Sequence, residues 1–154
     1  MSTRPRLFLD ANILVRSVLG NKVADLVDSY SERINFLAPQ SAWIEAERSV
    51  PKILEHLGRN SAYIQEAQQS LSDLRLTIGE IPMHFLEEKR ETALKRIAAR
   101  DPDDWPILAA SLVLDSPIWT EDQDFFGTGV PTWTTEHVEI YLKSQVVSHF
   151  SGGI

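Results

Sequence analysis

The sequence predicts an α/β fold, with a central parallel sheet of four to five strands and helices on both faces. Short apolar runs alternate with longer segments that show helical spacing of apolar residues. One segment, 104–114, is apolar on nearly every side, as expected of a helix buried inside a domain. The 154 residues are the length of one domain, without repeats or linkers. Strand alternating with helix favours a parallel sheet between two helical layers.

The first half of the chain is predicted to form two strands and four helices. The strands are the apolar runs 6–9, which ends at Asp10, and 34–38, which Pro39 ends. Glycine, proline and polar residues that could cap a helix separate the helices. Gly20 ends the first helix, Ser41 is the expected N-cap of the third, and Pro51 is expected to kink it. The expected helices are 12–19, 22–31, 41–57 and 61–74.

The second half is predicted to form three short strands and three helices. The strands are expected at 76–81, 118–120 and 130–133, and the helices at 83–99, 104–114 and 134–144. Residues 1–148 should therefore form a single domain. The segment 149–154, which contains Ser151, Gly152 and Gly153, is expected to be a flexible tail.

Charge and composition exclude several classes of protein. The net charge of −7 argues against a simple cationic DNA-binding module, although a site built to hold metal ions is itself acidic. The absence of cysteine excludes disulfides, thiolate metal sites and cysteine nucleophiles. Asp10 interrupts the first apolar run too early for a signal peptide, and the run 107–114 is too short to cross a membrane. We therefore expect a cytoplasmic protein.

Acidic residues stand where the predicted strands end. Asp10 directly follows the first strand, and Asp122 and Asp124 follow the strand at 118–120. Asp104 opens the buried helix, and Glu45 lies one turn into the helix after the second strand. Open parallel sheets bind ligands at the carboxyl ends of their strands, near the point where the strand order reverses. These side chains are thus expected to meet on one edge of the sheet.

A cluster of carboxylates calls for a cation. Two carboxylates about 4 Å apart repel each other by about 4 kcal/mol at an effective dielectric constant of 20. A divalent ion removes that repulsion, and ligands that are all oxygen suit Mg²⁺ or Mn²⁺. Metal ions held in this way activate water and stabilise charge on a phosphoryl group, so the pattern predicts phosphodiester hydrolysis. Taken singly, Asp104 is equally well explained as a helix cap, and Glu45 as part of a solvated helix face.

Four segments resemble the motifs of PIN-domain nucleases, in the family's order and over nearly the whole chain. The first is Leu7-Phe8-Leu9-Asp10-Ala11-Asn12, an apolar strand that ends in Asp-x-Asn. The second, Pro39-Gln40-Ser41-Ala42-Trp43-Ile44-Glu45, places a Glu on the following helix. The others are an Asp that opens an Ala-rich helix, Asp104-Trp105-Pro106-Ile107-Leu108-Ala109-Ala110, and Trp119-Thr120-Glu121-Asp122-Gln123-Asp124-Phe125.

The resemblance implies a PIN-like three-layer α/β/α sandwich and a ribonuclease that depends on Mg²⁺ or Mn²⁺. It further implies a VapC-like toxin, a small antitoxin as partner, and often a homodimer. Whether one or two metal ions act stays open. Carried over by position, the resemblance implies catalytic roles for Asp10, Glu45, Asp104, Asp122 and Asp124, of which the four aspartates bind metal. Asn12 would orient the first carboxylate, and Thr120 would support the site.

Two positions of the site have competitors in the sequence. Asp101 and Asp103 compete with Asp104, which fits best the spacing to the Ala-rich helix. Glu47 competes with Glu45, which fits best the spacing from Pro39.

Basic residues near the acidic segments are candidates for contacts with RNA phosphates. They are Arg16, Lys95, Arg96 and Arg100. The alternative for the last three is a solvated helix face, paired with the glutamates at 87, 88 and 91.

Two other functions fit an acidic site on such a fold. One is a phosphatase or another phosphoryl-transfer enzyme, which would need an Asp where Asn12 stands. The other is a catalytically silent PIN-like module that binds RNA or protein. An inactive site has no reason to keep such mutual repulsion, so we favour the nuclease.

Overall fold

The computed structural model describes residues 4–97 and 100–152. Its core is a five-stranded sheet in the order β3-β2-β1-β4-β5, in which every neighbouring pair is parallel. This confirms the predicted α/β class and the parallel sheet. The strands are β1 (Arg6–Leu9), β2 (Asn35–Pro39), β3 (Gly79–Ile81), β4 (Ile118–Trp119) and β5 (Thr132–Trp133).

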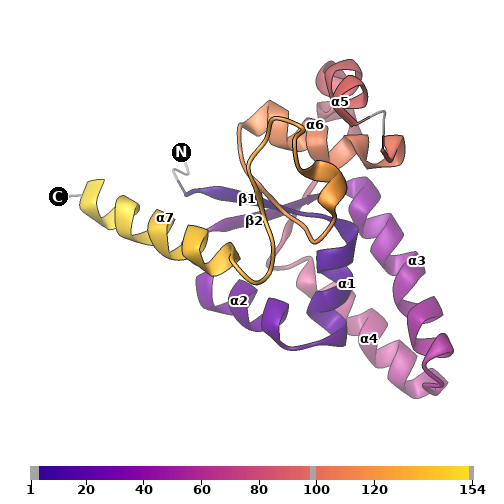
Figure 1. The fold of residues 1–154 in the computed structure, drawn as a ribbon. Helices are drawn as coiled ribbons and strands as arrows, with labels where there is room; N and C mark the ends of the chain where they lie inside the picture. The colour runs from indigo at the N-terminus through magenta and orange to yellow at the C-terminus, as the bar shows by residue number, and fades with distance from the viewer. Residues whose placement is uncertain (1–3, 98–99, 153–154) are drawn as a thin grey trace.

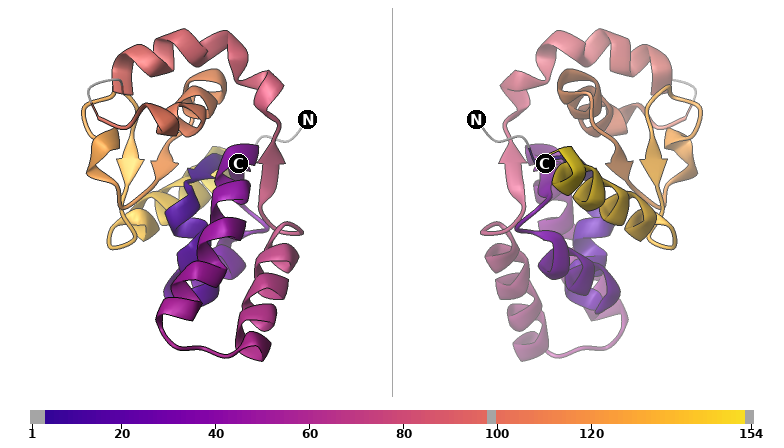
Figure 2. Two further views of the ribbon diagram at one scale, coloured as in Figure 1. Left: turned by 90° about the vertical axis from the view of Figure 1, so that its right-hand side faces the viewer. Right: turned by 90° about the vertical axis from the view of Figure 1, so that its left-hand side faces the viewer.

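Helices cover both faces of the sheet (Figure 1). The first four lie on one face, where α3 and α4 run side by side as a long hairpin (Figure 2). The α-helices are α1 (Ala11–Leu19), α2 (Lys22–Tyr30), α3 (Gln40–His56), α4 (Ser61–Leu74), α5 (Arg90–Ile97), α6 (Trp105–Leu114) and α7 (Val138–Gly152). Single 3₁₀ turns are η1 (Met83–Phe85), η2 (Glu87–Lys89), η3 (Pro102–Asp104) and η4 (Gln123–Phe125).

The alternation of side chains along β1 creates two separate cores. Leu7 and Leu9 pack into the core formed with α1 to α4 and α7, whereas Phe8 packs against α5 and α6. All three side chains are fully buried. A strand covered on both faces reads as a continuous apolar run, which is why β1 could be recognised in the sequence.

The order of the strands places a crevice at the carboxyl ends of β1 and β4. From β1 the chain builds outward to β2 and β3, and it then returns to add β4 and β5 on the other side of β1. The direction in which the chain adds strands therefore reverses between β1 and β4, and α/β proteins bind their ligands at such a switch point. Asp10 follows β1, and Thr120 and Asp122 follow β4, so all three lie at this switch point.

The helix predicted at 83–99 is wrong in its first part. The chain forms the 3₁₀ turns η1 and η2 before α5 begins at Arg90, and residues 98–99 lie outside the described residues. Leu86, Ala93 and Ile97 are all fully buried, as a continuous helix would also require. The apolar periodicity alone therefore did not reveal the tighter turns.

Helix ends differ most clearly from the prediction at two other places, whereas α1, α2 and α6 each differ by one residue at one end. Helix α3 begins directly after β2 with Pro39 as its cap, so Ser41 lies inside the helix instead of capping it. Helix α7 begins at Val138, since the Thr134 carbonyl accepts from the N–H groups of His137 and Val138 in a preceding turn. It continues to Gly152, beyond the predicted end. Residues 153–154 of the predicted flexible tail lie outside the described residues.

Across the described ranges, none of the helices combines the length and the apolar character that crossing a bilayer requires.

Candidate metal centre

Asp10 occupies the first position after β1 and caps α1. Its Oδ1 accepts a hydrogen bond from the backbone N–H of Ile13 at 3.0 Å, so the side chain fixes the start of the helix. Its Oδ2 accepts a hydrogen bond from the Thr120 hydroxyl, which follows β4. The residue is only 9% exposed. Both carboxylate oxygens are thus held in place at the switch point.

The pKa of Asp10 is raised from 3.8 to about 6, and burial is the largest cause, because the charged form loses its hydration. The hydrogen bonds from Thr120 and Ile13 oppose this rise, while the nearby charges of Asp122 and Glu45 add to it. The carboxylates of β1, α3 and the segment after β4 therefore interact in the folded protein, as their positions in the sequence predict.

Thr120 connects Asp10 to the next acidic segment. Its side chain is fully buried, donates to Asp10, and accepts from the backbone N–H of Asp122 at 2.9 Å. The Asp122 Oδ1 in turn accepts from the backbone N–H of Asp124 at 2.9 Å and caps η4. These bonds form one continuous path from Asp10 to Asp124.

Three carboxylates come close enough to share one ion. One oxygen from each of Asp104, Asp122 and Asp124 lies within 4.8 Å of the other two, and all three residues are half-buried. We call this group the aspartate triad. The pKa of Asp104 is raised from 3.8 to about 7, mainly by burial and then by the charges of Asp101, Asp122, Glu45 and Asp10. The carboxylates thus oppose each other's ionisation.

The geometry distinguishes the competing residues at the third position. Asp104 belongs to the aspartate triad, whereas the Asp101 side chain accepts from the backbone N–H of Asp103 at 3.1 Å and caps η3. Asp103 is exposed but lines the same cleft as Asp10, Glu45 and Asp104.

The geometry also distinguishes the two glutamates. Glu45 lines that cleft beside Asp10, while Glu47 pairs with Arg75 and has its carboxylate engaged elsewhere.

The donor set fits a hard divalent cation. Every acidic ligand offered by the aspartate triad and by Asp10 is a carboxylate oxygen, and no cysteine is present in the chain. Oxygen ligands of this kind suit Mg²⁺ or Mn²⁺ better than zinc. A cation would also relieve the repulsion that raises the pKa of Asp104.

The remaining predicted residues occupy different surroundings. Asn12 is exposed on α1, and in the ranges that the structure describes its side chain makes no hydrogen bond to Asp10, whose two oxygens bond to Ile13 and Thr120. Lys95 is exposed on α5. Arg16 is exposed and lines a cleft at the turn between α1 and α2, together with Lys22 and Thr135.

Arg96 and Arg100 bond to the protein itself. The Nη1 atom of Arg96 donates to the Thr128 carbonyl at 3.1 Å, and that of Arg100 donates to carbonyl groups of the segment 123–126. These bonds could not be predicted from the sequence, because the partners are backbone atoms more than 20 residues away. Glu121 was likewise not singled out, yet it accepts from the Thr135 N–H at 2.6 Å and ties the segment after β4 to the segment after β5.

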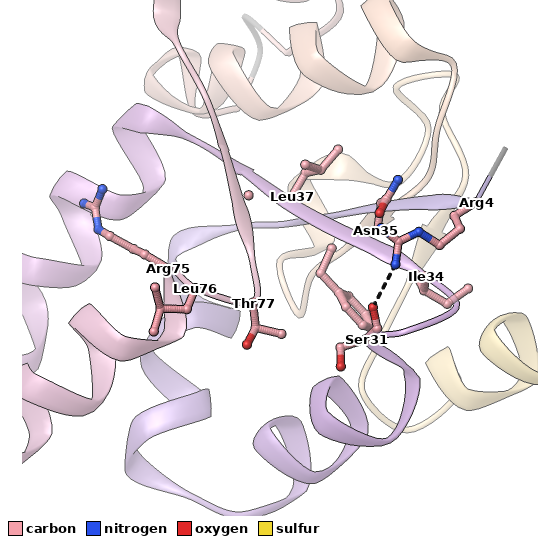
Figure 3. Close-up of a pocket in the computed structure, with 10 residues that line it drawn as sticks. Arg4, Ser31, Ile34, Asn35, Leu37, Arg75, Leu76 and Thr77 are labelled. Atoms are coloured by element: carbon pink, nitrogen blue, oxygen red, sulfur yellow. Dashed lines mark hydrogen bonds between the residues drawn. The ribbon is translucent and has the colours of Figure 1, made fainter. Parts of the chain in front are cut away.

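A larger cavity lies at the opposite, amino-terminal end of β2 and β3 (Figure 3). Arg4 donates there to the Ser31 carbonyl, and Arg75 pairs with both Glu47 and Glu80. No member of the acidic cluster lines this cavity, so the candidate site is the crevice at the carboxyl ends.

Fold and site define a parallel α/β domain with a carboxylate cluster at its switch point. A family model of the PIN domain matches residues 8–143. The chain therefore belongs to the PIN-domain family, as its four motifs predicted. A comparison with curated proteins found no match.

Solved structures with the same fold come from bacteria and an archaeon. VapBC2 from Rickettsia felis, bound to a DNA fragment from its promoter, is 11% identical, with 84% of this chain and 98% of that chain covered and a TM-score of 0.65. FitAcB from Neisseria gonorrhoeae is 16% identical, with 85% and 99% covered and a TM-score of 0.65. PAE2754 from Pyrobaculum aerophilum is 12% identical, with 94% and 99% covered and a TM-score of 0.71. These likenesses concern the fold.

Proposed function

We propose that this PIN-domain protein is a ribonuclease that depends on Mg²⁺ or Mn²⁺. The observation that carries the proposal is the aspartate triad, whose oxygens lie within 4.8 Å of one another beside the buried Asp10. Such a cluster is unfavourable without a cation and fits the all-oxygen coordination of these ions. The bound ion would supply an activated water and neutralise charge on the phosphoryl group.

Each acidic residue has a distinct part in the proposed reaction. Asp10, Asp104, Asp122 and Asp124 hold the metal. Glu45 faces the same cleft from α3 and acts as a catalytic carboxylate beside them. Thr120 fixes Asp10 through its hydroxyl and so keeps one oxygen of that carboxylate oriented. Asn12, which is exposed on the first turn of α1, is free to orient a phosphate or a water at the cleft.

The cleft between α1 and α2 supports a path for the RNA backbone. Arg16 and Lys22 line it, and across the described parts of the chain neither side chain forms an ion pair. Arg16 lies six residues after Asp10 on α1, which corresponds to about 9 Å along a helix. Phosphates on one side of the scissile bond would therefore meet this cleft. We retain Lys95 as a further phosphate contact, on the other side of the site.

The proposal extends to the biological setting. VapBC2 and FitAcB share the fold, and a further structure with 17% identity and a TM-score of 0.59 is a toxin–antitoxin complex from Klebsiella pneumoniae. We propose that the present chain is likewise the toxin of such a pair, cytoplasmic, with a small antitoxin protein as partner and a homodimer as its assembly.

A cleavage assay tests the proposed activity. Mixed short RNAs are incubated with the protein in Mg²⁺, in Mn²⁺ and in EDTA, beside the variants Asp10→Asn and Asp122→Asn. We expect the wild type to cleave RNA only in the presence of metal. Both variants should lose this cleavage while their circular dichroism spectra remain those of the wild type. Full cleavage by either variant would refute the residue assignment. Release of phosphate from phosphomonoesters without RNA cleavage would favour the phosphatase alternative.

A silent PIN-like module is the second alternative. It would bind RNA or a protein partner with the same affinity in EDTA as in Mn²⁺, and it would cleave nothing.

A further inference from the structure

Arg100 binds the turn that carries Asp124. Its Nη1 atom lies 2.9 Å from the carbonyl oxygen of Gln123, 2.7 Å from that of Asp124, and 2.7 Å from that of Phe126. A single nitrogen of the cationic side chain thus bonds to the carbonyl of Asp124 itself and to carbonyls before and after it in the chain. Hydrogen bonds from a charged donor are stronger than those between neutral groups, so this contact fixes the backbone from which the Asp124 side chain extends.

The backbone of Arg100 belongs to the other acidic segment. Its N–H donates to the Ile97 carbonyl at 2.9 Å, which anchors the residue to the end of α5. The chain then enters η3, where the N–H of Asp104 donates to the Asp101 carbonyl at 3.2 Å. Arg100 therefore lies four residues before Asp104, in the same short segment. Its side chain donates hydrogen bonds to the segment that contains Asp122 and Asp124.

We propose that Arg100 is a positioning residue that ties together the two segments of the aspartate triad. The proposal rests on the proposed metal-dependent function. Asp104 comes from η3, and Asp122 and Asp124 come from the segment after β4, so a single ion needs both segments at a fixed separation. Arg100 is a side chain that spans them by hydrogen bonds. Partners of this kind, outside the ligands themselves, commonly change metal affinity by about 10- to 100-fold when removed.

Charge and geometry predict opposite results when Arg100 is replaced. A cation beside an acidic site repels a metal ion, so the loss of its charge alone should tighten metal binding. The loss of a positioning contact should weaken it. Weaker binding therefore reports the geometric effect and cannot arise from the missing charge.

Arg96 provides the matched control. It is also an arginine close to the same loop, and its Nη1 atom also donates to a backbone carbonyl, that of Thr128 at 3.1 Å. That carbonyl lies four residues beyond Asp124, and Arg96 belongs to α5 and not to the segment of Asp104. A variant of Arg96 removes a comparable bond without separating the two parts of the aspartate triad.

The test is calorimetric titration with Mn²⁺ alone, with thermal unfolding in EDTA measured in parallel. The variants are Arg100→Met, Arg100→Lys and Arg96→Met, all in the full chain. We expect Arg100→Met to bind Mn²⁺ at least about 10-fold more weakly than the wild type. Arg100→Lys, whose ammonium group can donate to all three carbonyls, should recover most of the affinity. The Mn²⁺ affinity of Arg96→Met should stay within about twofold of that of the wild type, even if its melting temperature falls as far as that of Arg100→Met. Should Arg100→Met not fold, Arg100→Gln carries the same expectation.

The outcomes separate the two proposals. If the wild type binds Mn²⁺ and Arg100→Met binds it equally well or more tightly, the positioning role is overturned while the proposed function stands. An equal loss of affinity in Arg96→Met would also overturn it, because the effect would then be a general loosening of the loop. Absence of Mn²⁺ binding by the wild type would overturn the metal-dependent function, and the positioning role would fall with it.

Discussion

Replacing Asp104 by Asn should stabilise the metal-free protein. Burial and neighbouring carboxylates raise the pKa of Asp104 from 3.8 to about 7, so its ionised form is unfavourable in the folded state. Asp104 stands at the N-cap of α6 but makes no side-chain cap bond there. Asn therefore removes the charge with little loss of hydrogen bonding, while it keeps the size of the side chain.

The size of the effect follows from the change in pKa. A rise of about 3 pH units corresponds to about 4 kcal/mol for a fully buried group. Asp104 is half-buried, and solvent screening reduces this figure to about 2 kcal/mol. Loss of a favourable charge at the start of α6 costs up to about 1 kcal/mol. The net gain of about 1–2 kcal/mol corresponds to roughly 3–6 °C in melting temperature for a domain of this size.

The direction of the pH dependence is fixed by the sign of the shift. A carboxyl group whose pKa is raised in the folded state begins to destabilise that state as the pH rises above the unfolded pKa, and the destabilisation is complete above the folded pKa. The gain from Asp104→Asn should thus be complete above pH 7, shrink as the pH falls, and vanish below 3.8.

The assay is thermal unfolding of both proteins at pH 8 and pH 5, in EDTA and in Mn²⁺. In EDTA the variant should be the more stable at pH 8 and gain less at pH 5. In Mn²⁺ the order should reverse, because ligand binding to the folded state stabilises only the wild type fully. A variant that is no more stable than the wild type in EDTA at pH 8 would refute the electrostatic reasoning.

Four other results are expected. Binding of Mn²⁺ at pH 6 should release protons, detected by calorimetry in buffers of different ionisation enthalpy, because Asp10 and Asp104 have raised pKa values of about 6 and about 7; a release as large at pH 9 would contradict those values. Glu45→Gln should lower RNA cleavage at least about 10-fold, whereas the matched variant Glu47→Gln should cleave normally and lose at most about 1 kcal/mol from its exposed pair with Arg75; equal activities would remove Glu45 from the site. Thr120→Val should weaken Mn²⁺ binding, since Asp10 loses the hydroxyl that orients it, and unchanged affinity would dismiss that supporting role. Arg16→Ala should reduce the slope of RNA affinity against salt by about 0.7, and an unchanged slope would place that side chain away from the phosphates.

The sequence predicted the parts of the fold in which local pattern and burial agree. Strand β1 and helix α4 have the predicted bounds, because a fully apolar run and a clear amphipathic segment each favour one structure. The segment 83–89 was predicted as helix because its buried residue, Leu86, lies at helical spacing from the buried Ala93 and Ile97 of α5. Periodicity fixes which side chains face inward, and it leaves the exact hydrogen-bond pattern open.

The acidic cluster could be predicted because parallel strands bring their carboxyl ends to one edge. Asp10 and Asp122 follow neighbouring strands, so their proximity needs only the strand order. The choice between Glu45 and Glu47 required the structure, in which Arg75, directly after α4, binds Glu47 on the neighbouring helix α3. The same holds for Arg100, whose partners are backbone carbonyls of a distant turn and leave no trace in the pattern of side chains.

The most direct test of the metal centre is a crystal structure from crystals grown with MnCl₂, in which anomalous diffraction locates the manganese. We predict an anomalous peak bound by carboxylate oxygens of Asp104, Asp122 and Asp124, in the crevice that holds Asp10. The same experiment on Asp122→Asn should show the peak weakened or lost. Well-ordered carboxylates with no manganese between them, or manganese bound only elsewhere on the molecule, would contradict the account.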